Sequence, residues 1–142
     1  MVTADRPATP PSSRLRYLPI GVAASLAHLL MMIPGYSEEG DFELGTWLGV
    51  LAVSVLVAAV VFMFVVPGGG AVTGVALGAV ALASVVIFWA GLTLPLAAAA
   101  FLVGWHARQR GDRPGLANAA LGLAIISAVA LVAIIVGDAV AN

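Results

Sequence analysis

Apolar residues occur in five runs, which short polar or turn-forming segments separate. The longest uncharged stretch, Leu44–Trp105, contains no aspartate, glutamate, histidine, lysine or arginine. As one α-helix it would extend roughly 93 Å, about three times the 30 Å hydrocarbon core of a bilayer. Glycine and proline interrupt it at Pro67–Gly70 and again at Gly91–Pro95. The pattern therefore predicts an all-α, polytopic membrane bundle of five transmembrane helices, over about residues 17–34, 45–66, 71–90, 92–107 and 116–137.

The fourth predicted helix is the shortest. As a helix, residues 92–107 reach only about 24 Å, which is less than the thickness of the hydrocarbon core. The alternative is a four-helix bundle, in which residues 71–107 form one span. The two interpretations place the chain after residue 107 on opposite sides of the membrane. The positions of the arginines distinguish between them.

All six cations of the chain are arginines, and they fall into two groups. Arg6, Arg14 and Arg16 precede the first helix, and Arg108, Arg110 and Arg113 follow the fourth. Five helices place both groups on one side of the membrane, whereas four place them on opposite sides. Cytoplasmic loops of membrane proteins are enriched in basic residues, so the sequence favours five helices with the N-terminus inside.

The acidic and aromatic residues agree with this orientation. Most acids fall on the outer side, at Glu38, Glu39, Asp41, Glu43 and Asp138. Tryptophan and tyrosine prefer the headgroup level of a bilayer. The five-helix arrangement places Tyr17 and Trp105 at the inner face, and Tyr36, Trp47 and Trp89 at the outer face.

The N-terminal segment is expected to lie outside the bilayer. Residues 1–13 are polar and proline-rich, which predicts a disordered cytoplasmic tail, and residues 14–142 form the transmembrane domain. Arg14 and Arg16 followed by an apolar run also resemble the start of a signal peptide. No A-x-A cleavage site follows the run, so an uncleaved signal anchor is the preferred interpretation.

Composition narrows the class of protein and excludes several kinds of chemistry. Of 142 residues, 62% are hydrophobic and 9% charged, against about 25% charged in soluble domains, and the mean hydropathy is +1.11. The net charge of −1 gives no reason to expect a nucleic-acid partner. The absence of cysteine excludes disulfides and thiolate chemistry, and the absence of lysine excludes a P-loop and a Schiff base.

Three glycines form the strongest packing signal. Gly70, Gly74 and Gly78 recur at every fourth residue, so they share one face of the third predicted helix. Small residues at this spacing let a second helix approach closely in lipid. The neighbour can be a helix of the same chain or of a second copy. Gly45 and Gly49 repeat the spacing once on the second helix.

His28 is the only ionisable side chain placed well inside a predicted span, about 8–9 Å from the outer end of the first helix. Such residues are candidates for function. Met31 and Met32 share its face, but Met63 lies too deep to complete a soft-metal site, and no acid accompanies His28 and Ser25 in a catalytic triad. We expect a neutral histidine packed between helices, with a proton or ligand contact as the alternative. No catalytic, cofactor-binding or metal-ligating residue is predicted.

The short loop between the fourth and fifth helices is basic, with Arg108, Arg110 and Arg113 in eight residues, 108–115. The plain interpretation is that it determines topology. The alternative is that these arginines bind anionic lipid headgroups, because basic residues beside a membrane are attracted to its anionic surface.

The C-terminal third of the chain resembles a known kind of protein. Gly104–Arg108 ends one helix in G-x-x-A-R, the loop Gln109–Pro114 follows, and Gly115–Ala117 opens the next helix with small residues. This hairpin resembles one found in small uncharacterised multi-pass membrane proteins of high-GC bacteria. The resemblance implies a membrane domain without assigned catalytic residues.

These observations favour a multi-pass protein of the cell (inner) membrane, with an interaction or assembly role and no catalysis. Its expected surroundings are the lipid bilayer and either a second copy of the chain or another membrane protein. The alternative function is a small transport or ligand-binding subunit centred on His28.

Overall fold

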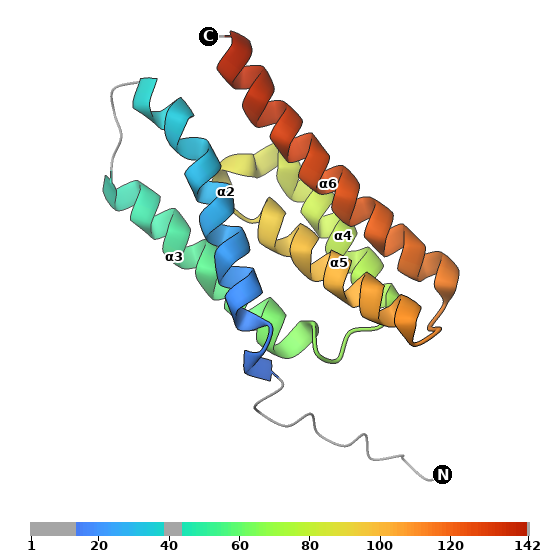
Figure 1. The fold of residues 1–142 in the computed structure, drawn as a ribbon. Helices are drawn as coiled ribbons and strands as arrows, with labels where there is room; N and C mark the ends of the chain where they lie inside the picture. The colour runs from blue at the N-terminus through green and yellow to red at the C-terminus, as the bar shows by residue number, and fades with distance from the viewer. Residues whose placement is uncertain (1–13, 39–43, 142) are drawn as a thin grey trace.

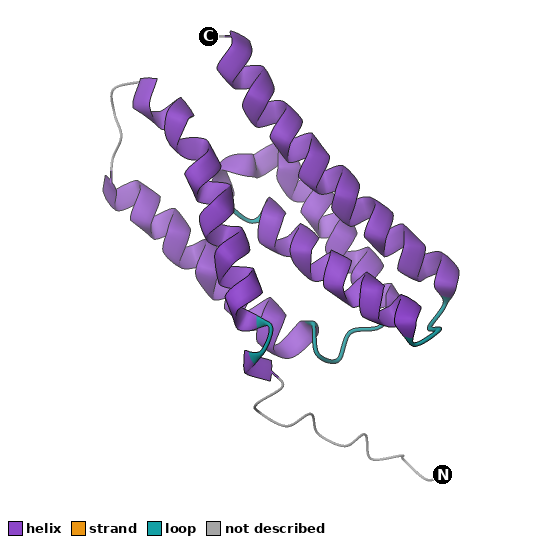
Figure 2. Ribbon diagram, viewed as in Figure 1, coloured by secondary structure: helices purple, strands orange, loops and turns teal. Residues whose placement is uncertain are grey.

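A computed structural model describes residues 14–38 and 44–141 (Figure 1). The described residues form five helices and no strand (Figure 2). The helices are α2 (Leu18–Glu38), α3 (Leu44–Val60) continuing as a π-helix (Val61–Val65), α4 (Ala71–Ser84) continuing as a 3₁₀ helix (Val85–Ala90), α5 (Thr93–Gln109) and α6 (Pro114–Ala141).

The prediction of an all-α chain with five helices is confirmed, and residues 71–107 do not form the single helix that the four-helix alternative required, because the chain turns between α4 and α5. Gly91 ends the 3₁₀ helix in the left-handed conformation, with φ of 70°. This conformation is favourable for glycine and costly for other residues. The glycine at the predicted interruption is therefore what reverses the chain. The predicted tail of residues 1–13 and most of the acidic outer loop, residues 39–43, lie outside the described residues.

The helices form two groups. α4, α5 and α6 pack against one another most extensively, and α2 and α3 form a hairpin whose α2 arm lies on α5 (Figure 1). α5 is the most enclosed helix, with nine buried residues, whereas α3 has two. The shortest helix therefore lies at the centre of the bundle.

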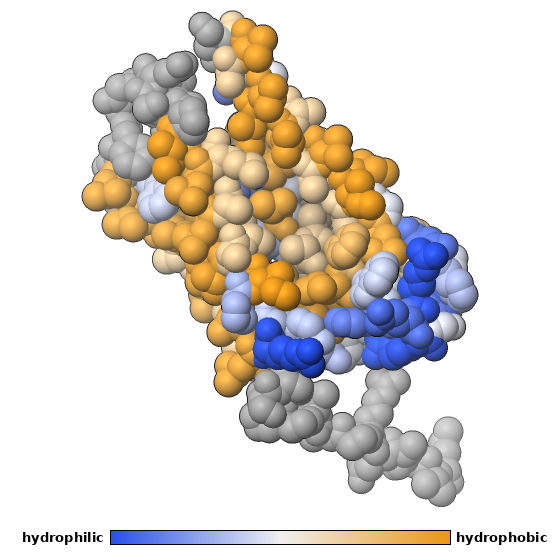
Figure 3. Space-filling view, viewed as in Figure 1, coloured by the Kyte–Doolittle hydropathy of each residue, from blue (hydrophilic) through white to orange (hydrophobic). Residues whose placement is uncertain are grey.

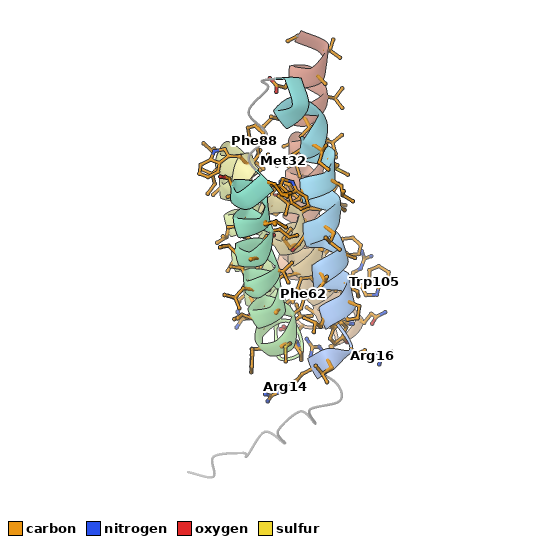
Figure 4. The ribbon with its side chains drawn as sticks, turned by 90° about the vertical axis from the view of Figure 1, so that its left-hand side faces the viewer. Arg14, Arg16, Met32, Phe62, Phe88 and Trp105 are labelled. Carbon is orange, nitrogen blue, oxygen red and sulfur yellow. The ribbon has the colours of Figure 1, made fainter. Side chains whose placement is uncertain are left out.

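Phe62 and Gly21 join the hairpin to the central helix. The Phe62 ring is fully buried and packs with Ala99 and Val103 of α5. A Cβ atom on Gly21 would lie 2.6 Å from the Phe62 ring, so only glycine admits the ring at this position of α2. Figure 4 shows Phe62 inside the bundle between its two ends.

Three helices are long and apolar enough to cross a membrane: Leu44–Val65, Ala71–Ala90 and Pro114–Ala141. The apolar part of α2, Leu18–Ile33, is shorter. The visible face of the bundle is largely apolar, and hydrophilic atoms gather at one end, over the start of α2 and the α5–α6 loop (Figure 3). Such an apolar surface suits a multi-pass membrane protein, since lipid covers it without the penalty that water would impose.

Candidate functional site

The connection between α4 and α5 lies below the end of the bundle, and buried polar side chains surround it. We call Phe88–Leu94 the sunken connection. His28 and Ser54 bind it. α2 continues from His28 for ten residues to Glu38, and α3 begins ten residues before Ser54, at Leu44. Both distances place the connection about 15 Å below the end of the α2–α3 hairpin. Figure 1 shows it beneath the ends of α2 and α6.

His28 bridges the two helix ends that meet in this connection. Its side chain is fully buried. The Leu94 N–H donates to Nδ1 at 3.2 Å, and Nε2 lies 2.8 Å from the carbonyl oxygen of Phe88. Because Nδ1 accepts a hydrogen bond, the proton is on Nε2, which donates to Phe88, and the ring is neutral. One imidazole thus satisfies a carbonyl at the end of one helix and an N–H at the start of the next.

Ser54 and Ser84 hold the remainder of the connection. The Ser54 hydroxyl donates to the Gly91 carbonyl oxygen at 2.7 Å. The Ser84 hydroxyl donates to the Ala81 carbonyl oxygen at 2.7 Å and lies 3.0 Å from the Thr93 hydroxyl oxygen, with which it is hydrogen-bonded. Non-helical backbone persists at membrane depth only where protein groups satisfy it. His28 of α2 and Ser54 of α3 supply those groups, and Ser84 of α4 bonds to the Thr93 side chain at the start of α5.

Ser25 differs from the other buried polar residues. It lies one helical turn before His28, it is fully buried, and its hydroxyl oxygen has no hydrogen-bond partner in the structure. A buried hydroxyl without a partner costs about 1–3 kcal/mol. Among the described residues around the sunken connection, the Ser25 hydroxyl is therefore a buried polar group whose hydrogen-bonding capacity is unused.

The methionines near His28 point to different surroundings. Met32 is buried, whereas Met31 is 42% exposed. In the described part of the chain, no three His, Cys, Asp or Glu side chains come together in a metal-ligating group. Both ring nitrogens of His28 are bonded to the main chain, so the geometry assigns the imidazole to the backbone.

The glycine face of α4 packs against another helix of the same chain, α6. A Cβ atom on Gly74 would lie 2.9 Å from the Ala120 Cβ, and one on Gly78 would lie 2.7 Å from the Leu123 Cβ. Gly104 of α5 makes the same kind of approach to Ala120, at 3.0 Å. α4, α5 and α6 therefore meet where each contributes a small residue. Gly70 lies at the end of this face, where a Cβ atom would lie 2.9 Å from an Asp112 oxygen.

Charged side chains hold the connection at the other end of α4, which we call the end connection (Pro67–Gly70, between the π-helix and α4). Asp112 Oδ2 accepts the Ala71 N–H at 2.9 Å and so caps α4 from the α5–α6 loop. An Arg110 Nη atom donates to the Gly69 carbonyl oxygen at 2.6 Å. The α5–α6 loop turns sharply here, with a φ of 70° at Gly111 and 42° at Arg113.

The five described arginines lie at this same end of the bundle, which we call the arginine end. They are Arg14, Arg16, Arg108, Arg110 and Arg113. The Arg14 guanidinium lies over the Phe64 ring, 5.7 Å from its centre. The Tyr17 and His106 rings meet edge to face at 5.7 Å and join the start of α2 to the end of α5. Figure 4 shows Arg14 and Arg16 at one end, with Met32 and Phe88 toward the other.

Sequence reasoning missed two features of these sites. The loop acid Asp112 was not recognised as a helix cap, although five helices place its loop beside the glycine-rich connection. Thr93 was assigned only to an interruption, although a threonine two residues after Gly91 is suited to bind across a turn. The partners of His28 carry no signal in the sequence, because they are main-chain atoms.

Comparisons with protein-family models, with curated proteins and with solved structures give no match to this chain. The resemblance of the C-terminal hairpin to membrane proteins of high-GC bacteria therefore identifies no family. The structure describes a small helical protein with three helices that are long and apolar enough to cross a membrane.

Proposed function

We propose that this chain is a multi-pass protein of the cell membrane that acts by assembling with another membrane polypeptide, a second copy of itself in the simplest case, and that it performs no catalysis. The N-terminus and the arginine end face the cytoplasm, and the C-terminus faces outside. The positive-inside rule supports this orientation, because the described arginines share one end of the bundle. In the same five-helix arrangement, the C-terminal end of α6 lies on the opposite side of the membrane from the arginine end.

The assembly role rests on one observation, the outward glycines of α3. Gly45 and Gly49 have the G-x-x-x-G spacing, and a Cβ atom built on either would meet nothing within 4 Å. The corresponding glycines of α4, Gly74 and Gly78, are closed by α6. Two faces of the same kind thus exist, and within the described residues only the α4 face is covered by another helix. Since small residues let helices approach closely in lipid, the open face suits a helix from another polypeptide.

Leu48 gives a direct test of this face, because it lies one turn from Gly45 and is 50% exposed. The chain has no cysteine, so Leu48→Cys introduces a single thiol. At native expression in intact membranes, oxidation is expected to link two copies through this position. Gly49→Ile in the same background should abolish most of the linked dimer, since the larger side chain keeps the helices apart.

Gly122→Ile is the matched control, because Gly122 of α6 also has open space around a Cβ atom. It is expected to leave the cross-link unchanged. Recovery of the monomer alone, both by cross-linking and by pull-down with a tagged copy, contradicts the self-assembly proposal. Equal loss in the two variants contradicts the assignment to α3.

Ser25 favours a second candidate function, a proton or ligand contact beside His28 in a transport or binding subunit. Ser25→Ala separates the two. For assembly alone, the variant is as stable as the parent or more so, because an unpartnered hydroxyl is removed. For a proton contact, the parent in liposomes carries protons to an enclosed pH-sensitive dye and Ser25→Ala does not. Absence of proton movement in the parent contradicts this second candidate.

A further inference from the structure

The fold brings Arg16 and Arg110 to one place at the arginine end, although they are far apart in the sequence. Arg16 directly precedes Tyr17, whose ring contacts the His106 ring of α5 at 5.7 Å. Arg110 follows His106 by one helical turn. Two cations that are far apart in the sequence therefore lie close to one aromatic contact.

The local charge at this end is not balanced. The described residues of the arginine end include five arginines and a single carboxylate, that of Asp112. This carboxylate already accepts the Ala71 N–H. Arg110 is held by its bond to the Gly69 carbonyl oxygen, which leaves further guanidinium N–H groups to donate. Two exposed arginines, one of which is held by a hydrogen bond, are suited to an anion, since guanidinium groups match phosphate geometry.

Apolar side chains extend from this pair along the side of the bundle. Trp105 is 46% exposed, and its ring stacks on Phe101, which is 41% exposed, at 6.4 Å between ring centres. Ile20 on the neighbouring α2 is 42% exposed. Figure 3 shows hydrophilic atoms at this end directly beneath apolar surface. An anion bound here would have apolar protein surface beside it, which an acyl chain can cover and a free ion cannot.

We propose that Arg16 and Arg110 bind the phosphate of an anionic phospholipid, whose acyl chains lie along Trp105 and Phe101. The site differs from a general basic surface, because it is formed by one arginine from the start of α2 and one from the end of α5. Arg113 belongs to the same end of the bundle but follows in the α5–α6 loop, outside the His106 contact. It therefore serves as the charge-matched control.

Quenching of Trp105 by brominated lipid measures the proposal at the site itself. Trp47→Phe and Trp89→Phe leave Trp105 as the only tryptophan of the full chain. The protein is placed in phosphatidylcholine vesicles that contain the same fraction of brominated phosphatidylglycerol or brominated phosphatidylcholine. We expect stronger quenching by phosphatidylglycerol. Arg16→Gln should reduce the preference about fivefold, as expected for loss of one arginine at an anionic surface.

The control variants distinguish lipid binding at Arg16 and Arg110 from a general attraction of anionic lipid to the basic surface. Arg113→Gln should retain most of the preference, and Arg110→Gln should lose it as Arg16→Gln does. If Arg110→Gln fails to fold because its bond to Gly69 is lost, Arg16→Gln carries the test, with gel filtration and the tryptophan emission maximum verifying its fold. Equal quenching by the two lipids, or equal loss in Arg16→Gln and Arg113→Gln, overturns the proposal. Displacement of the lipid by excess inorganic phosphate would show a phosphate site and overturn the lipid assignment.

Discussion

The two connections on either side of α4 satisfy their main-chain groups with different chemistry. In both, a helix ends and another begins, which leaves main-chain groups without partners. At the sunken connection, neutral side chains satisfy them: His28 binds Phe88 and Leu94, and Ser54 binds Gly91. At the end connection, charged side chains do so: Asp112 binds Ala71, and Arg110 binds Gly69.

Depth accounts for the difference. The sunken connection lies about 15 Å below the end of the hairpin, where a charge would be costly and a neutral hydrogen-bonding group is tolerated. The end connection lies among the arginines, where water and headgroups solvate a charge. The comparison indicates that polar residues in this protein are selected by depth, and that each connection depends on a side chain distant in the sequence.

The largest effect is expected for His28→Leu. The leucine fills the space but leaves the Leu94 N–H without its partner at depth, and the Phe88 carbonyl oxygen keeps only its hydrogen bond from the Gly91 N–H. An unsatisfied group costs about 1–3 kcal/mol and a lost hydrogen bond about 1 kcal/mol, so the free energy of unfolding should fall by about 2–4 kcal/mol. Unfolding in mixed detergent micelles measures it. Met31→Leu, an exposed position on the same helix, is the control and should change little. Equal stability of the two variants would remove the role assigned to the imidazole.

Gly74→Ala tests the close packing of α4 against α5 and α6. This packing fixes the position of α4 and so of the connections at its two ends. The new methyl group would lie 2.9 Å from the Ala120 Cβ and 3.3 Å from the Gly104 nitrogen, so helices must move apart. We expect a loss of about 1–3 kcal/mol, as for overpacked cores. Gly122→Ala, where the added atom meets nothing within 4 Å, provides the comparison by the same unfolding measurement. No difference between the two would contradict the close approach of α4 to α6.

Asp112→Ala should cost about 1 kcal/mol, the usual value of a lost helix N-cap. Asp112→Asn keeps an acceptor oxygen for Ala71 without the charge and should recover part of that stability. Because the end connection is exposed to ions, added salt should reduce the difference between aspartate and asparagine. A difference that is independent of salt would place Asp112 away from water and so weaken the comparison of the two connections.

The smallest effect is expected for Ser54→Ala, about 0.6–1 kcal/mol, as measured for single hydrogen bonds between membrane helices. Its bond to Gly91 adds to those of His28 on the same connection. Salt should leave the effect unchanged, since both groups are neutral and buried. A salt-dependent loss in this variant would contradict the depth assigned to the sunken connection.

The sequence predicts the number of helices because charges and turn residues are rare enough to mark where the apolar runs stop. Gly91 and the Pro67–Gly70 segment locate both connections, and the spacing of Gly74 and Gly78 indicates a closely packed face. Helix ends are less well predicted: α6 extends to Ala141, beyond the expected residue 137, because no strong breaker ends it. The sequence places His28 inside a predicted transmembrane helix. It does not predict the two main-chain groups to which His28 is hydrogen-bonded.

The sequence also does not predict which face of each helix points into the bundle. In a soluble helix, apolar residues that recur about every three to four positions mark the buried side. Here lipid and core are both apolar, so Leu29, which is buried, and Leu30, which is 57% exposed, look alike in the sequence. The depth of the sunken connection depends on the packing of α5 against α2 and α3, and no local pattern records that packing.

Single-cysteine accessibility is the most direct test of the central claim, that one connection is sunken and the other lies at a membrane surface. Gly68→Cys, Leu92→Cys and Val140→Cys each give one thiol in this cysteine-free chain. A membrane-impermeant maleimide added to intact cells should label position 140, position 68 only after permeabilisation, and position 92 in neither case. Labelling of position 92 as readily as position 140, or of positions 68 and 140 from the same side, would contradict the account.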